Sequence, residues 1–197
     1  MKYKVVEHFT SIQGEGAQMG TPATFIRLQG CNLSCDFCDE PKHKNKKLVK
    51  ELTKRQILAL CDAYLVVITG GEPSLNNINP LIQFLQKNGH AVAVESNGYS
   101  FNNIKTANLK TLCPKFGHEV DFEAGWDEIK ILVDRSMPKQ FIKEQIEHWA
   151  KLNIGVYLQP INYKSGINKS NMQYVVELCI EFGVPLSPQL HKLLEVE

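Results

Sequence analysis

The sequence predicts an α/β protein built as a partial, open barrel of the (β/α)6 type with mainly parallel strands. Short apolar and β-branched runs alternate with longer amphipathic segments, which is typical of parallel strands joined by right-handed helical crossovers. A complete eight-fold barrel takes about 250 residues, whereas this chain has 197. Hydrophobic residues make up 43% and charged residues 22%, which excludes disorder and coiled coil as good interpretations.

The strands are predicted from short apolar runs that end at polar or turn-forming residues. The runs lie at residues 24–28, 65–69, 91–95, 110–113, 129–133, 156–159 and 184–186. A further run at 3–9 adds a strand at the N-terminus. Six or seven parallel strands are fewer than a closed barrel needs, so the sheet is expected to stay open.

The helices are predicted from amphipathic stretches with recognisable ends. Thr53 caps a helix that runs to residue 64, and Asn79 followed by a proline starts one that ends at Gly89. A third helix opens at residue 136 or 138 and runs to 152, and a fourth runs from 169 to 182 before Gly183. In such folds the chemistry lies at the carboxyl ends of the strands.

Charge and cysteine content narrow the class of function. The net charge of +1 leaves no overall basic footprint for nucleic acid. The N-terminus lacks a signal peptide's apolar stretch, and the run at 65–68 is far too short to span a membrane. We therefore expect a cytoplasmic protein without a membrane span. In a reducing compartment, six cysteines favour metal binding or catalysis over disulfides.

Three of the six cysteines follow the strand at 24–28 within eight residues. Cys31, Cys35 and Cys38 have the spacing C-x3-C-x2-C, and three thiolates on one tight loop can converge on a single metal centre. A 4Fe–4S cluster accepts up to four thiolates, so three leave one iron open for chemistry. The alternatives are a structural zinc site, with His43 or Cys61 as fourth ligand, and three ordinary buried thiols.

The cysteine loop, with Phe37 before its last cysteine, resembles the signature of the radical S-adenosylmethionine (SAM) superfamily. This resemblance implies a 4Fe–4S cluster and SAM as cofactors, and one radical SAM domain over residues 1–197. The segment Thr69-Gly70-Gly71-Glu72-Pro73 resembles the superfamily segment that contacts the SAM amino group. Two glycines at a strand end also let the backbone approach a ligand closely.

Further strand ends fit the same site. Glu95-Ser96-Asn97-Gly98 places a carboxylate, a hydroxyl and an amide after the strand at 91–95, which suits a ribose or an amino-acid moiety. Cys113-Pro114-Lys115 resembles a Ser-Pro-Lys cofactor contact of a related family, with cysteine in place of serine, and Gln159-Pro160 resembles an element that closes over SAM. Each could also be an ordinary turn or strand stop. The expected cofactor contacts are Phe37, Asp39, Gly70, Gly71, Glu72, Ser96, Cys113, Pro114, Lys115, Gln159 and Pro160.

Four segments resemble the 7-carboxy-7-deazaguanine synthase family: residues 11–16, 25–31, 128–130 and 186–192. This resemblance implies conversion of 6-carboxy-5,6,7,8-tetrahydropterin into 7-carboxy-7-deazaguanine with loss of ammonia, in queuosine and deazapurine biosynthesis. The implied substrate contacts are Ile12, Gln13, Gly14, Glu15, Arg27, Thr69 and Glu197. An amide and a carboxylate suit the edge of a pterin, and an arginine can hold a carboxylate through two parallel bonds.

The same resemblance implies that a 5′-deoxyadenosyl radical takes hydrogen from the substrate and later returns it, which regenerates SAM. It also implies a magnesium ion, held in the family by Thr or Ser two residues after the last cluster cysteine. This chain has Glu40 at that position. A carboxylate is a hard oxygen ligand, so we predict magnesium at Glu40.

The resemblance also implies partners and leaves rival functions open. We expect a homodimer, and a flavodoxin or ferredoxin as electron donor. The basic run from Lys42 to Arg55 is either a solvated face or a docking patch for that acidic donor. The rival enzyme is a glycyl-radical-enzyme activase, and the rival from another class is a zinc-binding module.

Overall fold

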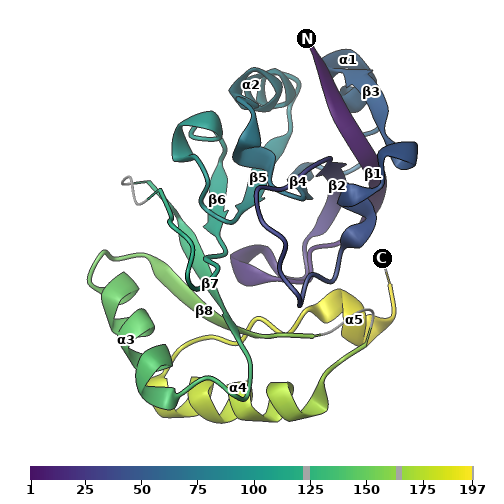
Figure 1. The fold of residues 1–197 in the computed structure, drawn as a ribbon. Helices are drawn as coiled ribbons and strands as arrows, with labels where there is room; N and C mark the ends of the chain where they lie inside the picture. The colour runs from purple at the N-terminus through teal and green to yellow at the C-terminus, as the bar shows by residue number, and fades with distance from the viewer. Residues whose placement is uncertain (122–124, 163–165, 197) are drawn as a thin grey trace.

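The computed structural model describes residues 1–121, 125–162 and 166–196. These residues form an eight-stranded sheet in the order β3-β1-β2-β4-β5-β6-β7-β8. Its strands are β1 (Lys2–Ile12), β2 (Pro22–Leu28), β3 (Lys50–Thr53), β4 (Leu65–Gly70), β5 (Ala91–Ser96), β6 (Leu109–Leu112), β7 (Glu128–Val133) and β8 (Gly155–Pro160). From β2 to β8 neighbouring strands pair in parallel, whereas β1 is antiparallel to both of its neighbours. The predicted open, mainly parallel α/β sheet is confirmed (Figure 1).

Successive side chains along a strand lie in two different environments. In β7, Ile129 and Ile131 are fully buried in the main hydrophobic core, while Lys130 between them lies on the opposite, inner face. This alternation follows from the two-residue period of a strand. The outer face of the sheet therefore carries the main core. The inner face carries polar side chains and a second, smaller apolar cluster of Ala23, Leu65, Val67 and Ala93.

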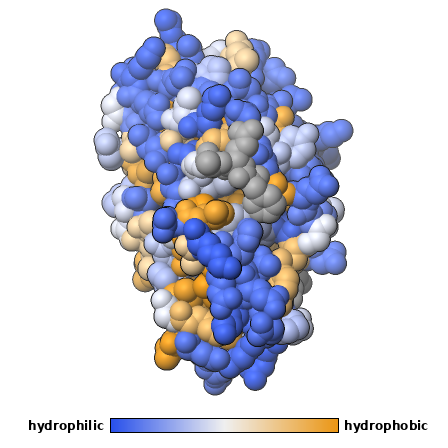
Figure 2. Space-filling view, turned by 90° about the vertical axis from the view of Figure 1, so that its left-hand side faces the viewer, coloured by the Kyte–Doolittle hydropathy of each residue, from blue (hydrophilic) through white to orange (hydrophobic). Residues whose placement is uncertain are grey.

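The helices are α1 (Lys54–Leu58), α2 (Asn79–Lys87), α3 (Lys139–Ala150), α4 (Lys169–Phe182) and α5 (Leu190–Leu194). In α3, Ile142, Ile146 and Trp149 recur at helical spacing and are buried against the sheet. The face of the molecule that includes α3 is mostly hydrophilic, with scattered apolar groups (Figure 2). No helix of the described ranges is apolar over a length that could cross a bilayer.

Several predicted boundaries need correction. The predicted helix 53–64 ends at Leu58, although Thr53 caps it together with Gln56 as expected. Residues 184–186 form no strand, since only Leu186 makes an isolated bridge to β8. The strand predicted at 110–113 lies at Leu109–Leu112. The short strand β3 was not predicted, because its polar sequence Lys-Glu-Leu-Thr pairs with β1 at an edge rather than burying an apolar face.

Candidate active site

A cavity of about 1260 Å³ opens at the carboxyl ends of the parallel strands. Its lining includes the ends of β2, β4, β5, β7 and β8 and the loops that follow them. Most of the sequence-predicted site residues share this lining: Ile12, Gln13, Glu15, Arg27, Cys31, Cys35, Phe37, Cys38, Asp39, Glu40, Thr69, Gly70, Gly71, Ser96, Cys113, Lys115, Gln159 and Pro160. Gly14, Glu72 and Pro114 do not line it, and Glu197 lies outside the described residues.

The cysteine loop joins β2 to the 3-10 helix at Pro41–Lys44. Its three thiols are free and half-buried. The amide of Cys38 donates to the carbonyl of Cys35 at 3.2 Å, which folds the loop tightly. Burial raises the pKa of Cys31, and nearby Glu72 and the other two thiols raise it further. Among the described side chains no group of three could share a single metal ion, which does not favour a zinc site. Three thiols of one loop that line the same cavity fit a 4Fe–4S cluster, in which each thiolate binds a different iron.

The two glycines at the end of β4 are required by close approach of the backbone. A Cβ on Gly70 would lie 2.3 Å from the carbonyl oxygen of Leu28, and one on Gly71 would lie 1.8 Å from that of Gly30. Any side chain here would push β4 away from the start of the cysteine loop. These glycines therefore hold the loop against the sheet, in addition to lining the cavity.

Glu72 connects two loops rather than facing the cavity. Its carboxylate accepts hydrogen bonds from the Ser74 amide at 2.8 Å, the Ser96 hydroxyl at 2.7 Å and the Asn97 amide at 2.6 Å. It is 2% exposed. In this structure Glu72 positions the loops after β4 and β5, and its predicted contact with SAM stays a prediction.

Three more predicted SAM contacts, Cys113, Lys115 and Gln159, line the cavity, and their polar groups already make contacts within the protein. Gln159 accepts a hydrogen bond from the Ser187 hydroxyl at 2.8 Å through Oε1. Lys115 Nζ donates to the carbonyl of Cys113 at 2.9 Å, so this lysine folds back on its own loop. The Cys113 thiol lies 3.5 Å from a carboxylate oxygen of Glu95, and burial raises its pKa to about 12.

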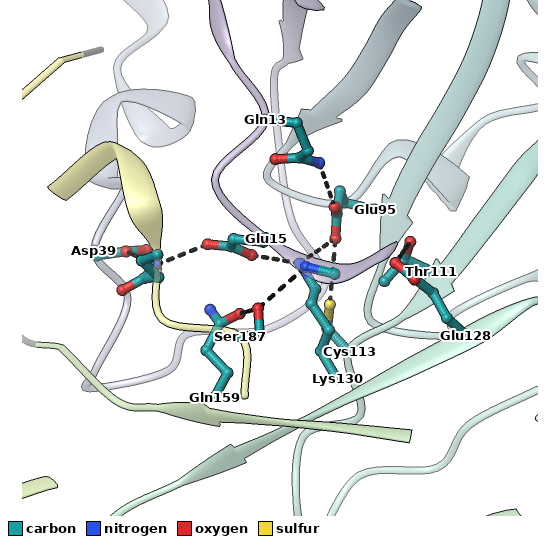
Figure 3. Close-up of polar contacts among 12 residues, drawn as sticks. Gln13, Glu15, Asp39, Glu95, Thr111, Cys113, Glu128, Lys130, Gln159 and Ser187 are labelled. Atoms are coloured by element: carbon teal, nitrogen blue, oxygen red, sulfur yellow. Dashed lines mark hydrogen bonds and ion pairs between the residues drawn. The ribbon is translucent and has the colours of Figure 1, made fainter. Parts of the chain in front are cut away.

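A buried ammonium group lies at the centre of the inner face. Lys130 on β7 is 1% exposed and pairs with Glu15 and, at 2.5 Å, with Glu95 (Figure 3). Gln13 Nε2 donates to Glu95 at 3.1 Å, and Gln189 Nε2 donates to Glu15 at 2.8 Å. Two carboxylates thus share one cation away from water, a costly arrangement unless all partners are present. We call Glu15, Glu95 and Lys130 the Lys130 triad.

The triad separates the ionisation of its two carboxyl groups. Burial alone would raise the pKa of Glu15, but the ammonium of Lys130 and two hydrogen bonds outweigh it and lower the pKa to about 2. For Glu95 burial prevails, and its pKa is raised despite the same ammonium. Burial opposes the charge of Lys130 too, yet Cys113 and the two carboxylates raise its pKa. The triad therefore places an ionised Glu15 beside the cavity.

The C-terminal segment, residues 186–196, forms one side of the cavity through Gln189, His191 and Lys192. Lys192 on α5 pairs with Asp39 of the cysteine loop at 2.7 Å, and Gln189 donates to Asp39 at 3.2 Å. The amide of Leu190 donates to the carbonyl of Gly14 at 2.8 Å. A Cβ on Gly14 would lie 2.2 Å from the His191 ring, so a glycine lets the segment pack on the N-terminal loop.

Arg27 lies at another edge of the cavity among charged side chains. Its Nε donates to Glu7 at 2.9 Å and lies 3.4 Å from Glu40. The other oxygen of Glu40 accepts the Lys42 amide at 2.9 Å. Both oxygens of Glu40 are thus engaged by positive or donor groups, and these surroundings do not fit a magnesium ion.

Sequence reasoning assigned no role to several residues of the cavity. Lys130 had a signal, because a lysine between two isoleucines of a buried strand needs a partner. Glu95 was noted only as part of a polar strand end. Glu7 had no local signal, since only the pairing of β1 with β2 brings it beside Arg27. Lys42 was assigned only to the basic run, although it also lines the cavity.

Comparison with known proteins identifies the family. A model of the radical SAM superfamily matches residues 25–179. The 7-carboxy-7-deazaguanine synthase of Rickettsia prowazekii (strain Madrid E) is 33% identical over 100% of this chain and 89% of its own length. That of Bacteroides thetaiotaomicron is 33% identical over 100% of both chains. The crystal structure of QueE from Escherichia coli superposes with a TM-score of 0.79 at 31% identity, over 97% of this chain and 95% of that one.

These matches span the cysteine loop, the sheet and the C-terminal segment, so they cover the same elements that form the cavity. They confirm the enzyme class predicted from the motifs, and neither the activase nor the zinc-binding module is favoured. The chain belongs to the radical SAM superfamily and, within it, to the 7-carboxy-7-deazaguanine synthase family.

Proposed function

We propose that the protein converts 6-carboxy-5,6,7,8-tetrahydropterin into 7-carboxy-7-deazaguanine with loss of ammonia, using SAM catalytically. One observation carries this proposal: a single cavity presents Arg27 at one edge and, on its inner wall, the Glu15 carboxylate beside Lys130 and the amide of Gln13. The arginine suits the substrate carboxylate. The carboxylate and amide suit the donor and acceptor edge of the pterin ring.

The 4Fe–4S cluster and SAM of the superfamily have residues to hold them here. Cys31, Cys35 and Cys38 would ligate the cluster, while the strand ends at Gly70, Ser96, Gln159 and the other predicted positions would contact SAM. When bound, the cluster and SAM supply a carbon radical strong enough to remove hydrogen from the substrate.

The chain's own residues hold the substrate and limit access to it. Glu15 stays ionised beside Lys130, so it accepts hydrogen bonds from N–H groups of the pterin. The C-terminal segment, tied to Asp39 through Lys192, covers one side of the cavity. Covering matters because a primary carbon radical reacts with whatever reaches it first.

An acidic electron donor, a flavodoxin or ferredoxin, is proposed to dock on the basic run between Lys42 and Arg55. Lys44 Nζ donates to the Ser34 hydroxyl at 3.2 Å, so this run borders the cysteine loop. Changing Lys44, Lys46 and Lys47 to Glu should slow reduction by flavodoxin about tenfold or more at low salt. Reduction by dithionite should be unchanged, and an unaltered flavodoxin rate at low salt would remove this role.

A homodimer, a single domain over residues 1–197 and a cytoplasmic location complete the proposal. The homodimer and the single domain rest on the resemblance to the family. Light scattering of the reconstituted enzyme tests the dimer by its mass. The cytoplasmic location rests on the free thiols of Cys31, Cys35 and Cys38, because their use as cluster ligands requires reducing surroundings.

The test is an anaerobic incubation of the reconstituted enzyme with SAM, a reductant and the carboxylated pterin, followed by mass spectrometry. We expect 7-carboxy-7-deazaguanine to form. Arg27→Met should lower kcat/KM by roughly a hundredfold, because it removes a bidentate charged partner. An enzyme that cleaves SAM but leaves the pterin unchanged would contradict the proposed function and favour the activase.

A further inference from the structure

Four charged side chains at the Arg27 edge of the cavity form one connected group: Glu7, Arg27, Glu40 and Lys42, here called the Arg27 cluster. One oxygen of Glu7 accepts from Arg27 Nε at 2.9 Å, and its other oxygen pairs with the Lys42 ammonium. Glu40 contacts Arg27 at 3.4 Å and the Lys42 amide at 2.9 Å. All four line the cavity, and the side chains of Glu7, Arg27 and Glu40 are at most 20% exposed.

The cluster is balanced in charge, with two carboxylates and two cations. Burial would raise the pKa of Glu7, but Lys42 and Arg27 lower it, and the same contact raises the pKa of Lys42. A divalent ion at Glu40 would lie within a few ångströms of a guanidinium. Like charges at so short a distance repel each other strongly where water is partly excluded. The Arg27 cluster thus disfavours the magnesium ion that the position of Glu40 in the sequence suggests.

The cations keep donors available for a ligand. Among the described residues, Arg27 donates a hydrogen bond only through Nε, to Glu7. Its guanidinium carbon lies 5.8 Å from the centre of the Phe9 ring. The two terminal amino groups can then clamp a carboxylate in parallel. The Lys42 ammonium has three donors, of which Glu7 takes one. Glu7 and Glu40 therefore position the two cations without consuming them.

We propose that the Lys42 ammonium supplies the positive charge that a magnesium ion would otherwise provide, at the carboxylate subsite that the proposed function places at Arg27. The enzyme is accordingly independent of added divalent ions. Glu7 acts as a positioning residue for both cations. This inference rests on the proposed function, because that function defines the carboxylated substrate.

The first test measures ligand affinity in the SAM-bound holoenzyme under anaerobic conditions. Two ligands are compared: 6-carboxytetrahydropterin and tetrahydropterin without the carboxyl group. Lys42→Met should weaken binding of the first roughly tenfold, since it removes a charge-assisted hydrogen bond, and should leave binding of the second unchanged. The control is Lys143→Met, an exposed lysine on α3 paired with Glu147, which should change neither. Equal losses for both ligands, or no loss for either, would overturn the assignment.

The second test uses Mn²⁺ as a paramagnetic substitute for magnesium. Free Mn²⁺ is titrated with native holoenzyme and followed by electron paramagnetic resonance, and turnover is measured in metal-depleted buffer with and without magnesium. We expect no loss of the free-ion signal and equal rates. Stoichiometric Mn²⁺ binding, or turnover that requires magnesium, would overturn metal independence. Failure of the native enzyme to use the pterin at all would instead contradict the proposed function, so the two failures are distinguishable.

Discussion

At the scale of single residues, Lys130 is the buried cation that Glu15 and Glu95 share. Replacing it with Met leaves Glu15 and Glu95 buried together without their shared cation. We expect a loss of about 3 to 5 kcal/mol in the free energy of unfolding, since removing one partner leaves an uncompensated buried charge. Urea denaturation of the protein without its iron–sulfur cluster measures this loss of stability, with Lys143→Met as the exposed control.

A second substitution separates charge from packing in this variant. Adding Glu95→Gln to Lys130→Met removes one of the two repelling carboxylates, so part of the lost stability should return. If Lys130→Met costs no more than the exposed control, or if Glu95→Gln adds a further loss, the account of the Lys130 triad is wrong.

The ionisation of Glu15 gives a pH-dependent prediction. Its pKa falls from the usual 4.5 to about 2, which corresponds to a stabilisation on the order of 3 kcal/mol. A lowered carboxyl pKa contributes stability above the unfolded value, and that contribution is lost as the pH falls through the folded value. The stability difference between native protein and Glu15→Gln should therefore be constant above pH 4.5 and shrink toward pH 2. A difference independent of pH would contradict this pairing.

The residue scale also shows what sequence reasoning could find. The spacing of Cys31, Cys35 and Cys38 is local, so the sequence alone could place all three on one loop, and the structure places them at the cavity. Glu7 was not, because its role depends on which residue of β2 lies opposite it in the antiparallel pair. Glu72 shows a third case: its motif was recognised, yet its side chain holds two loops together.

At the scale of elements, the end of α4 depends on Gly183. This residue terminates the helix with φ at +65°, and a Cβ there would meet no atom within 4 Å. Gly183→Ala should therefore cost about 1 kcal/mol through backbone strain alone. Gly183→Asn should cost less, because asparagine tolerates this conformation. Thermal denaturation compares the two variants, and equal losses would indicate that packing rather than backbone conformation decides the effect.

The elements that could be predicted share strong local signals. The bounds of α4 follow from its apolar period and Gly183, and Thr53 was recognisable as a cap. The helix after Thr53 was predicted too long because helical spacing of apolar residues continues past Leu58, where the chain instead turns toward β4. The short helix α5 escaped prediction, since its placement depends on tertiary contacts with Gly14 and Asp39.

At the scale of the whole molecule, the parallel sheet brings together side chains from distant parts of the chain. Glu15, Glu95 and Lys130 come from the N-terminal loop, β5 and β7, and they meet on the inner face. Parallel strand order makes such a meeting at the carboxyl ends predictable in general. The partners within it were not predictable, because they depend on how the N-terminal loop folds into the open side of the sheet.

The central claim is that this chain forms 7-carboxy-7-deazaguanine while regenerating SAM. The most direct measurement is the number of product molecules formed for each molecule of SAM lost, determined by mass spectrometry in an anaerobic reaction with limiting SAM. The account predicts many molecules of product for each SAM lost. If SAM is lost in proportion to the 5′-deoxyadenosine formed and no 7-carboxy-7-deazaguanine appears, the central claim is contradicted.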